Sequence, residues 1–334
     1  MRLATIADSQ AWTLRPALES PDGSWFDLRD LFRTQRIAVP SYAAQIVQAV
    51  EHLDELAEVA ARWPQDAKDL AHPIDVAKSG VHFLPPIPAP RTFRDFYAFE
   101  AHVAACRARR KLPMEPGWYE QPVFYFSNPV ALVGHQTPIC GPRGSNELDY
   151  ELELGLVIGR GGRDIAAGDA WDHVAGFTLI NDFSARDLQR KEMAVGLGPA
   201  KGKDFATAVG PSLVTLDALR DRIDSSDRLH LRMTARVNGR ELSRGDSSSM
   251  YFTWPQIIEH ASADVELLPG DLVGSGTVGT GCILELGPEN TGGWLKPGDV
   301  VELEIERLGV LSTPIVARVD HPNGKEHPKS HTRT

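Results

Sequence analysis

The sequence has very few cysteines, no long hydrophobic run and no excess of basic residues. Its three cysteines, Cys106, Cys140 and Cys282, include no C-x-x-C pair, which argues against a disulfide framework and against a thiolate zinc site. No apolar stretch approaches the ~18 residues of a membrane span, and the first residues lack the apolar core of a signal peptide. Lys and Arg number 35 against 45 Asp and Glu, and the net charge of −10 argues against nucleic acid as a partner. We therefore expect a cytoplasmic protein that binds neither nucleic acid nor membrane.

Proline and glycine are well represented, with 24 and 29 residues, and this composition favours a turn-rich, β-rich chain. A length of 334 residues corresponds to roughly two domains of about 150 residues each. The clearest boundary is the segment 81–90, where four prolines within six residues would stop a helix or a central strand. We predict a small N-terminal domain over residues 1–80, a larger domain over 84–320, and a flexible tail over 322–334, which has no apolar side chain.

Helices are expected to be few. One is predicted to begin at Ser41, its candidate N-cap, and to end before Pro64, because apolar side chains recur there at helical spacing. A second is predicted from Ser184, again as the N-cap, to about Ala194, and a short third one after Trp254. Most of the remaining chain alternates with the period of a strand.

Two stretches alternate apolar and acidic residues. In residues 148–154 the acidic side chains Glu151 and Glu153 share one face, and residues 301–306 repeat the pattern with Glu302, Glu304 and Glu306. Two carboxylates on one face repel each other unless a cation lies between them, and all-oxygen ligands suit Mg²⁺, Ca²⁺ or Mn²⁺. The same alternation is typical of an exposed sheet face, so periodicity alone does not choose between the two stretches.

Residues outside the alternating stretches favour the first one as a metal site. Asp182 ends an apolar run where the second helix is predicted to begin, a position that suits a third carboxylate ligand. Lys203 follows shortly afterwards. Upstream, Asp95 and His102 offer a further carboxylate and a base.

Two phosphate-binding patterns are present only in part. Residues 274–279 match G-x-G-x-x-G, but residues 282–286 predict a strand rather than the helix that must receive a dinucleotide's pyrophosphate. Residues 198–204 are one residue short of a phosphate-binding loop, and Asp204 replaces the Ser or Thr that would hold magnesium. The sequence therefore predicts no nucleotide site.

Five segments, in this order, resemble the fumarylacetoacetate hydrolase family over residues 84–320. They are Asp95-Phe96-Tyr97 with His102, Leu148 to Glu153, Asn181 to Gln189, Gly202 to Phe205, and Gly274 to Thr277. The resemblance implies a mixed, β-rich α+β fold with a β-roll core of the fumarylacetoacetate hydrolase type. It also implies a small N-terminal domain and a homodimer.

The resemblance further implies a set of site residues. Carboxylates hold a divalent cation in such enzymes, and the matching positions here are Asp95, Glu151, Glu153 and Asp182. Lys203, as a catalytic group, and Thr207 fall where the family keeps groups near the metal's water. Substrate-contacting positions are occupied by Tyr97, Tyr125, Arg186, Gln189 and Thr277.

Within the family, the fumarylacetoacetase type uses a His after Asp-Phe-Tyr that is oriented by a Glu in a later Leu-Glu-Leu strand. His102 and Glu285 match this arrangement, with Glu285 between Leu284 and Leu286. The resemblance therefore implies a hydrolase that cleaves a C–C bond in fumarylacetoacetate or a related 2,4-diketo acid, as in aromatic amino acid catabolism. The basic residue that would contact the substrate's distal carboxylate is one of Arg109, Arg110 and Lys111.

Two other kinds of function use the same residues. A lyase or isomerase of the same family, such as an acylpyruvase, an oxaloacetate decarboxylase or an isomerase of unsaturated dioates, would also form an enolate on a metal. A non-catalytic, metal-stabilised binding protein would need neither His102 nor Lys203, so the presence of both favours an enzyme.

Overall fold

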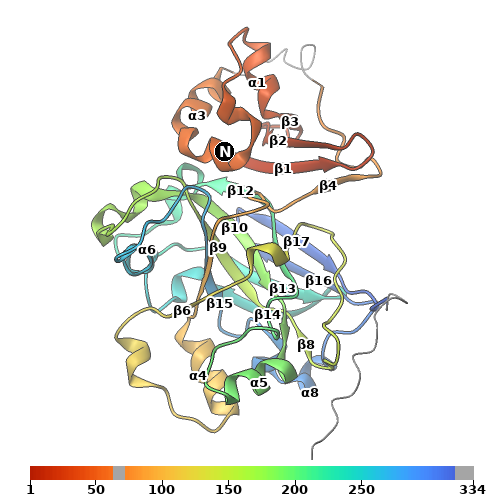
Figure 1. Cartoon of the computed structure of the whole chain (residues 1–334), viewed down its shortest axis with the longest axis vertical. Coiled ribbons are helices and arrows are strands. Elements are labelled where there is room, and N and C mark those ends of the chain that lie inside the picture. The colour runs from red at the N-terminus through yellow and green to blue at the C-terminus, as the bar shows by residue number, and fades with distance from the viewer. Residues whose placement is uncertain (63–71, 320–334) are drawn as a thin grey trace, which may run out of the picture.

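Most strands join one large mixed sheet in the computed structural model, which describes residues 1–62 and 72–319 (Figure 1). Along its main path the strands are, in order, β3 (Trp25–Asp27), β2 (Thr13–Glu19), β1 (Arg2–Asp8), β12 (Thr207–Thr215), β10 (Val174–Asp182), β9 (Leu152–Ile158), β15 (Leu272–Thr277), β5 (Phe93–Phe96) and β6 (Phe124–Phe126). Two further strands join this sheet: β4 (Val81–Phe83) pairs with β1, and β7 (Leu132–Val133) pairs with β12. The tail predicted over residues 322–334 lies outside the described residues.

Two smaller sheets and several short helices complete the described chain. The first sheet has the order β14 (Arg240–Asp246), β13 (Arg232–Val237), β16 (Val300–Ile305) and β17 (Gly309–Pro314), and the second pairs β11 (Ser184–Ala185) with β8 (Leu148–Asp149). The helices are α1 (Leu28–Thr34), α2 (Ile46–Ala49), α3 (Leu53–Ala61), α4 (Glu100–Arg109), α5 (Arg186–Ala194), α6 (Trp254–Ser262), α7 (Ile283–Leu286) and α8 (Pro288–Thr291). The structure thus has the mixed, β-rich α+β class that the sequence predicts.

The strand that carries the first acidic stretch is buried on both faces. Every residue of β9 is buried, Glu153 included, because β10 and β15 flank it and core side chains cover both sides. The alternation in residues 148–154 therefore does not mark an exposed sheet face. The chain also leaves the strand conformation at Tyr150 and Glu151, between β8 and β9.

The second acidic stretch is an ordinary half-exposed strand. In β16 the burial alternates, with Val301, Leu303 and Ile305 in the core and the glutamates half-buried on the other face. Glu304 forms an ion pair with Arg236 of the neighbouring strand at 2.7 Å. The strand β13 turns into β14 through Asn238 and Gly239, whose φ angles of 53° and 78° are those of a tight hairpin turn.

The N-terminal strands continue the large sheet rather than forming a separate one. β1 pairs with β12 and also with β4, and Thr5 donates a hydrogen bond to the Pro86 carbonyl at 2.8 Å. The single helix predicted from Ser41 is broken, because Gln45 is extended (φ −150°, ψ 141°), and Pro40 rather than Ser41 precedes its first turn. The division of the chain at residues 80–84 stays a prediction.

Helices at the opposite end of the molecule from the N-terminal elements carry several predicted site residues (Figure 1). α5 ends at Ala194 as predicted, but it begins at Arg186, and Ser184 belongs to β11 instead of capping the helix. α6 is present after Thr253, which caps it. α4 was not predicted, since its buried residues His102, Val103 and Cys106 do not make an apolar stripe.

The predicted strand over residues 282–286 is wrong, because Ile283–Leu286 form the helical turn α7. The carboxylate of Asp149 accepts the backbone N–H groups of Ile283 and Leu284 at 2.7 and 2.9 Å. A helix start leaves such N–H groups without partners inside the helix, so this distant carboxylate stabilises the turn. The match to G-x-G-x-x-G begins inside β15, at Gly274.

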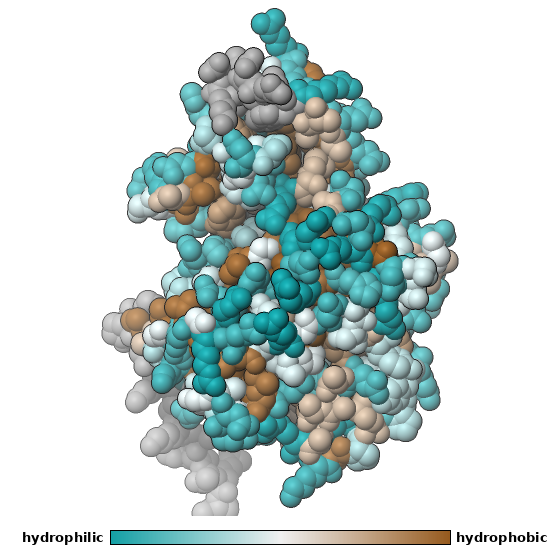
Figure 2. Space-filling view, turned by 180° about the vertical axis from the view of Figure 1, so that it is seen from behind, coloured by the Kyte–Doolittle hydropathy of each residue, from teal (hydrophilic) through white to brown (hydrophobic). Residues whose placement is uncertain are grey.

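Among the described residues, no helix combines the length and the apolar character needed to cross a bilayer. The face shown in Figure 2 is mostly hydrophilic, with hydrophobic residues in separate small patches.

Candidate active site

Neighbouring strands of the large sheet bring the predicted metal-site residues together. Asp182 of β10 is paired in register with Thr207 of β12, and Glu153 of β9 with Thr277 of β15. On the other side of β15, Gly274 pairs with Asp95 of β5, which in turn pairs with Tyr125 of β6. The site is therefore built from cross-strand neighbours, which fixes the relative positions of its side chains.

Five buried carboxylates lie in this region, and two buried cations contact three of them. The carboxylates are Asp95, Asp149, Glu151, Glu153 and Asp182, and the cations are Lys203 and Arg186. Burying several negative charges is costly unless cations and hydrogen bonds compensate them. Five carboxylates can carry more negative charge than two cations neutralise, so the cluster can accept additional positive charge.

Lys203 and Arg186 both contact Glu151. The ammonium of Lys203 lies between Glu151 and Asp182, with 2.7 Å to Asp182, and Arg186 donates to Glu151 and Asp149 at 2.8 Å each. Burial would raise the pKa of Glu151, but the two cations lower it to about 2. Gln189 accepts a hydrogen bond from the Arg186 guanidinium at 3.0 Å.

The remaining two carboxylates lack such compensation. Burial, and then the charges of neighbouring carboxylates, raise the pKa values of Asp95 and Glu153 well above the ordinary range. The oxygens Asp95 Oδ1 and Glu153 Oε2 are buried without a hydrogen-bond partner among the described residues. Buried polar atoms are almost always paired, so these two oxygens fit a ligand role toward a divalent cation.

Gly274 makes the space in front of these oxygens. A Cβ atom at Gly274 would lie 2.3 Å from Asp95 Oδ1 and 3.4 Å from Glu153 Oε2. Side chains do not approach that closely, so any residue other than glycine would displace the Asp95 carboxylate. The donor set, the two orphaned oxygens and this glycine together fit a hard divalent cation held by oxygen ligands.

Replacing Gly274 by alanine is therefore expected to abolish the rise in melting temperature that Mg²⁺ produces in the wild type. Gly198 is the matched control, since nothing lies within 4 Å of a Cβ atom there, and Gly198→Ala should keep the full rise. Thermal unfolding with Mg²⁺ and with EDTA measures both. An unchanged Mg²⁺ response in Gly274→Ala would contradict the carboxylate site.

Hydroxyl groups donate hydrogen bonds to two of the carboxylates, Asp182 and Glu153. Tyr125 and Thr207 donate to Asp182 at 2.6 and 3.0 Å, and Thr277 donates to Glu153 at 3.2 Å. The structure thus places Tyr125 and Thr277 against the carboxylates. Their predicted contacts with substrate, and the predicted role of Thr207 near a water, stay predictions.

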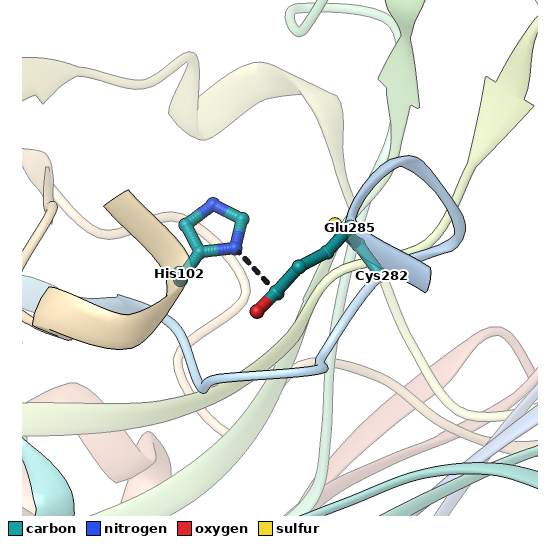
Figure 3. A group of neighbouring side chains, drawn as sticks. All are labelled: His102, Cys282 and Glu285. Carbon is teal, nitrogen blue, oxygen red and sulfur yellow. Dashed lines mark hydrogen bonds and ion pairs between the residues drawn. The ribbon is translucent and has the colours of Figure 1, made fainter. Parts of the chain in front are cut away.

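His102 and Glu285, which are far apart in the sequence, form a buried pair. His102 Nδ1 lies 3.0 Å from Glu285 Oε2 (Figure 3). The other Glu285 oxygen accepts a hydrogen bond from the Thr280 backbone N–H at 2.7 Å. Burial would lower the pKa of His102, but hydrogen bonds with Cys282 and Glu285 raise it to about 10. The edge of the Tyr97 ring packs against the imidazole, with 5.5 Å between ring centroids.

The His102–Glu285 pair is connected to the carboxylates through Asp149. Asp149 receives the N–H groups of the α7 turn that carries Glu285, and it also receives the Arg186 guanidinium, which reaches Glu151. In the sequence, Asp149 stands inside the segment from Leu148 to Glu153, and nothing there assigns it a role of its own. Its contacts with α7 could not be predicted, because no local pattern pairs these segments.

The three basic residues at the end of α4 have different surroundings. Arg109 contacts Glu289 at 3.7 Å and donates to the Glu285 carbonyl at 3.3 Å. Arg110 donates a hydrogen bond to the Cys106 carbonyl at 3.3 Å. Burial raises the pKa of the Tyr97 hydroxyl, and the positive charge of Arg110 opposes this effect. Lys111 is exposed.

The chain belongs to the fumarylacetoacetate hydrolase family, because residues 91–316 match the model of the fumarylacetoacetate (FAA) hydrolase C-terminal domain. The family resemblance predicted from the sequence is thereby confirmed, and the chain is a member of an enzyme family whose substrates are small molecules. A mitochondrial oxaloacetate tautomerase of Xenopus laevis is 31% identical over 318 residues, which are 95% of this chain and 90% of the relative.

Two solved structures share the fold. A fumarylacetoacetate hydrolase from Exiguobacterium antarcticum is 25% identical with a TM-score of 0.69, and the match covers 95% of this chain and 100% of that one. A maleylpyruvate hydrolase from Sphingobium sp. SYK-6, in complex with manganese(II) and pyruvate, is 22% identical with a TM-score of 0.67 and coverages of 95% and 99%. The fumarylacetoacetate hydrolase type of fold is thus confirmed, and the maleylpyruvate hydrolase with the same fold holds manganese(II).

Proposed function

We propose that this chain is a metal-dependent hydrolase that cleaves a C–C bond in a fumarylacetoacetate-like or related 2,4-diketo acid. The observation that carries the proposal is the buried pair of His102 and Glu285, 3.0 Å apart, which the Asp149–Arg186 contacts link to the carboxylates. Hydrolysis needs a group that activates water, whereas a structural metal site does not. The cation is Mg²⁺, Ca²⁺ or Mn²⁺, which the oxygen-only donor set and the manganese complex of the maleylpyruvate hydrolase support.

Each part of the site has a chemical role in this mechanism. The cation, held by Asp95, Glu151, Glu153 and Asp182, would stabilise negative charge on substrate oxygens as a Lewis acid. Glu285 accepts the Nδ1–H of His102, which leaves Nε2 as the nitrogen that takes a proton from water.

In the remaining steps the hydroxide oxygen bonds to a carbonyl carbon of the substrate, and the π electrons of that carbonyl move to its oxygen. When they return, the adjacent C–C bond breaks, its electron pair passes to the departing enolate, and the enolate takes the proton that His102 removed from water. Lys203 and Arg186, the two buried cations that contact Glu151, would donate to the developing negative charge. Tyr97, beside the imidazole, and Gln189, beside Arg186, would orient the substrate.

A second candidate function is the keto–enol tautomerisation of a 2-oxo dicarboxylic acid such as oxaloacetate. It is favoured by the oxaloacetate tautomerase of Xenopus laevis, whose similarity extends over 95% of this chain. This reaction moves one proton between a carbon and an oxygen of the substrate. His102 could carry that proton without any attack by water.

A product assay separates the two functions. With Mg²⁺, fumarylacetoacetate or an acylpyruvate should lose its diketo absorbance and yield two acids in equal amounts, and EDTA should stop the reaction. Acceleration of oxaloacetate enol–keto exchange, with no cleavage of any diketo acid, would instead establish the second function. Absence of both activities in metal-loaded enzyme would contradict both candidates.

Three properties stay predictions. They are the homodimer and the role in aromatic amino acid catabolism, which follow from the family resemblance, and the cytoplasmic location, which was expected from the composition. Size-exclusion chromatography with light scattering tests the first, and a monomer at micromolar concentration would contradict it.

A further inference from the structure

A second group of possible metal ligands lies between α4 and α7, where the soft donor atoms of the chain are concentrated. One ligand atom from each of His102, Cys282 and Glu285 lies within 4.8 Å of the other two (Figure 3). Cys106, one helical turn after His102 on α4, places its Sγ 3.6 Å from His102 Nε2. Two of the chain's three cysteines therefore meet at one imidazole, although their sequence spacing predicts no thiolate site.

These donor atoms favour a different metal ion from the one that the carboxylate cluster favours. Thiolate, imidazole and carboxylate are the usual ligands of Zn²⁺, whereas Mg²⁺ and Ca²⁺ prefer oxygen ligands alone. Tetrahedral zinc with bonds of about 2.0–2.3 Å keeps its ligand atoms roughly 3.3–3.8 Å apart. The observed separations, none above 4.8 Å in the three-residue group, need only small side-chain shifts to reach this geometry.

The two sulfurs lie in different surroundings. The hydrogen bond between them lowers the pKa of the Cys106 thiol, whereas burial and the same hydrogen bond raise the pKa of the Cys282 thiol well above its ordinary range. A bound metal ion deprotonates a coordinating thiol, so the separations between the donor atoms, rather than these pKa shifts, are what suit the site to Zn²⁺. All four side chains are nearly or fully buried, with only 4% of the His102 side chain and 7% of the Glu285 side chain exposed. Such burial favours a tightly held ion over a loosely bound surface ion.

We propose that His102, Cys282 and Glu285, with Cys106 as the fourth donor, form an inhibitory Zn²⁺ site. The inhibition rests on the proposed function, because zinc would take up the two side chains that activate water. A bound ion would coordinate the imidazole lone pair and the Glu285 oxygen that orients the ring, so His102 could no longer act as a base. The carboxylate site would still hold its own cation. The enzyme would thus require one divalent metal and be switched off by another.

The binding part of this proposal is tested with Co²⁺, which replaces Zn²⁺ and is visible spectroscopically. The whole protein is kept reduced and saturated with Mg²⁺, so that the carboxylate cluster is filled. Co²⁺ should then produce the near-ultraviolet absorption band of a thiolate–cobalt bond, and Zn²⁺ should displace it. Cys282→Ser should lose most of the band, whereas Cys140→Ser, which removes the cysteine outside the cluster, should keep it.

The inhibition part is measured as the Zn²⁺ concentration that halves the Mg²⁺-dependent rate. In Cys282→Ser this concentration should rise by about 10- to 100-fold or more, since even outer partners of metal ligands contribute that much to affinity. Cys140→Ser should match the wild type. Cys106→Ser provides a second variant of the cluster, with a smaller rise, and melting temperatures verify that each variant is folded.

Several outcomes would overturn the proposal. One is the absence of a thiolate–cobalt band in the wild type, which depends on no variant and on no activity. Another is inhibition by Zn²⁺ that disappears with excess Mg²⁺ and is equal in all cysteine variants, because zinc would then act at the carboxylates. If the enzyme proves inactive on every substrate while the band is present and depends on Cys282, the metal site stands and the proposed function fails.

Discussion

Replacing His102 by alanine is expected to lower turnover by about 10²- to 10⁴-fold, the usual range for a positioned general base. Metal binding should stay intact, since none of the cluster's carboxylates depends on His102 for a hydrogen bond. His230 is the matched control, because it forms a similar pair with Asp224 at 2.8 Å but is 47% exposed. His230→Ala should leave turnover unchanged, and an equal loss in both variants would show a general effect on folding.

Glu285→Gln should cost less than His102→Ala, because the imidazole remains but loses its preferred tautomer and its stabilised charge. The double variant should be little worse than His102→Ala alone, since the two side chains act as one unit. Measured kcat values for the four proteins give the coupling directly. A double variant whose loss is the product of the two single losses would assign the residues independent roles.

The pH dependence of the rate follows from the same pair. Hydrogen bonds with Cys282 and Glu285 raise the pKa of His102 to about 10, against the opposing effect of burial. A protonated imidazole cannot take a proton from water, so activity should fall as the pH drops through this pKa. The acid limb should therefore lie above the ordinary His value of about 6.5 and move to lower pH in Glu285→Gln. An acid limb that is identical in both proteins would contradict the role of Glu285.

The second large effect is expected at Glu153. Glu153→Gln preserves the shape of the side chain but removes the charge from an oxygen that has no hydrogen-bond partner among the described residues. We expect it to abolish metal-dependent turnover, as Glu151→Gln should, although the latter also deprives Lys203 and Arg186 of a partner. Steady-state rates titrated with Mg²⁺ and with EDTA measure the loss.

Glu304→Gln is the control for this prediction. Glu304 belongs to the other stretch that alternates apolar and acidic residues, but it pairs with Arg236 on a half-exposed face, so its replacement should be nearly neutral. Mg²⁺ at a hundred times its dissociation constant should add about 2.7 kcal/mol to the free energy of unfolding of the wild type and of Glu304→Gln. Equal behaviour of Glu153→Gln and Glu304→Gln would place the metal elsewhere.

The family resemblance singles out four of the five buried carboxylates of the cluster, and these four lie on strands of the large sheet or next to them. Asp95, Glu153 and Asp182 each belong to a strand of the large sheet, and register alone then brings them together with Thr207 and Thr277. The alternation of apolar and acidic residues was less informative about the position of the metal site. It was the same in a buried stretch and in a half-exposed one, and residues outside both, Asp182 among them, were needed to favour the first stretch as the metal site.

Apart from Glu285, which the family resemblance pairs with His102, the surroundings of His102 could not be predicted, because they depend on contacts between distant segments. α4 lacks an apolar stripe, so hydrophobic periodicity did not identify it as a helix. α7 contains a Leu-Glu-Leu pattern typical of a strand, yet hydrogen bonds from its backbone N–H groups to Asp149 hold it as a helical turn. The meeting of Cys106 and Cys282 follows from these two helices, and no spacing rule for cysteines could reveal it.

The pairing of β1 with β12 has a consequence for any shortened form of the enzyme. The family match begins at residue 91, which invites expression of the catalytic part by itself. Removing β1 would leave Leu213 and Val214 of β12 without their strand partners Leu3 and Arg2. Removing the N-terminal elements would also expose the apolar cluster in which Leu31 and Phe32 pack with Ile180 and Leu213. An open, apolar sheet edge is a template for aggregation. The truncated chain would therefore self-associate through the strand whose first residue, Thr207, bonds to Asp182.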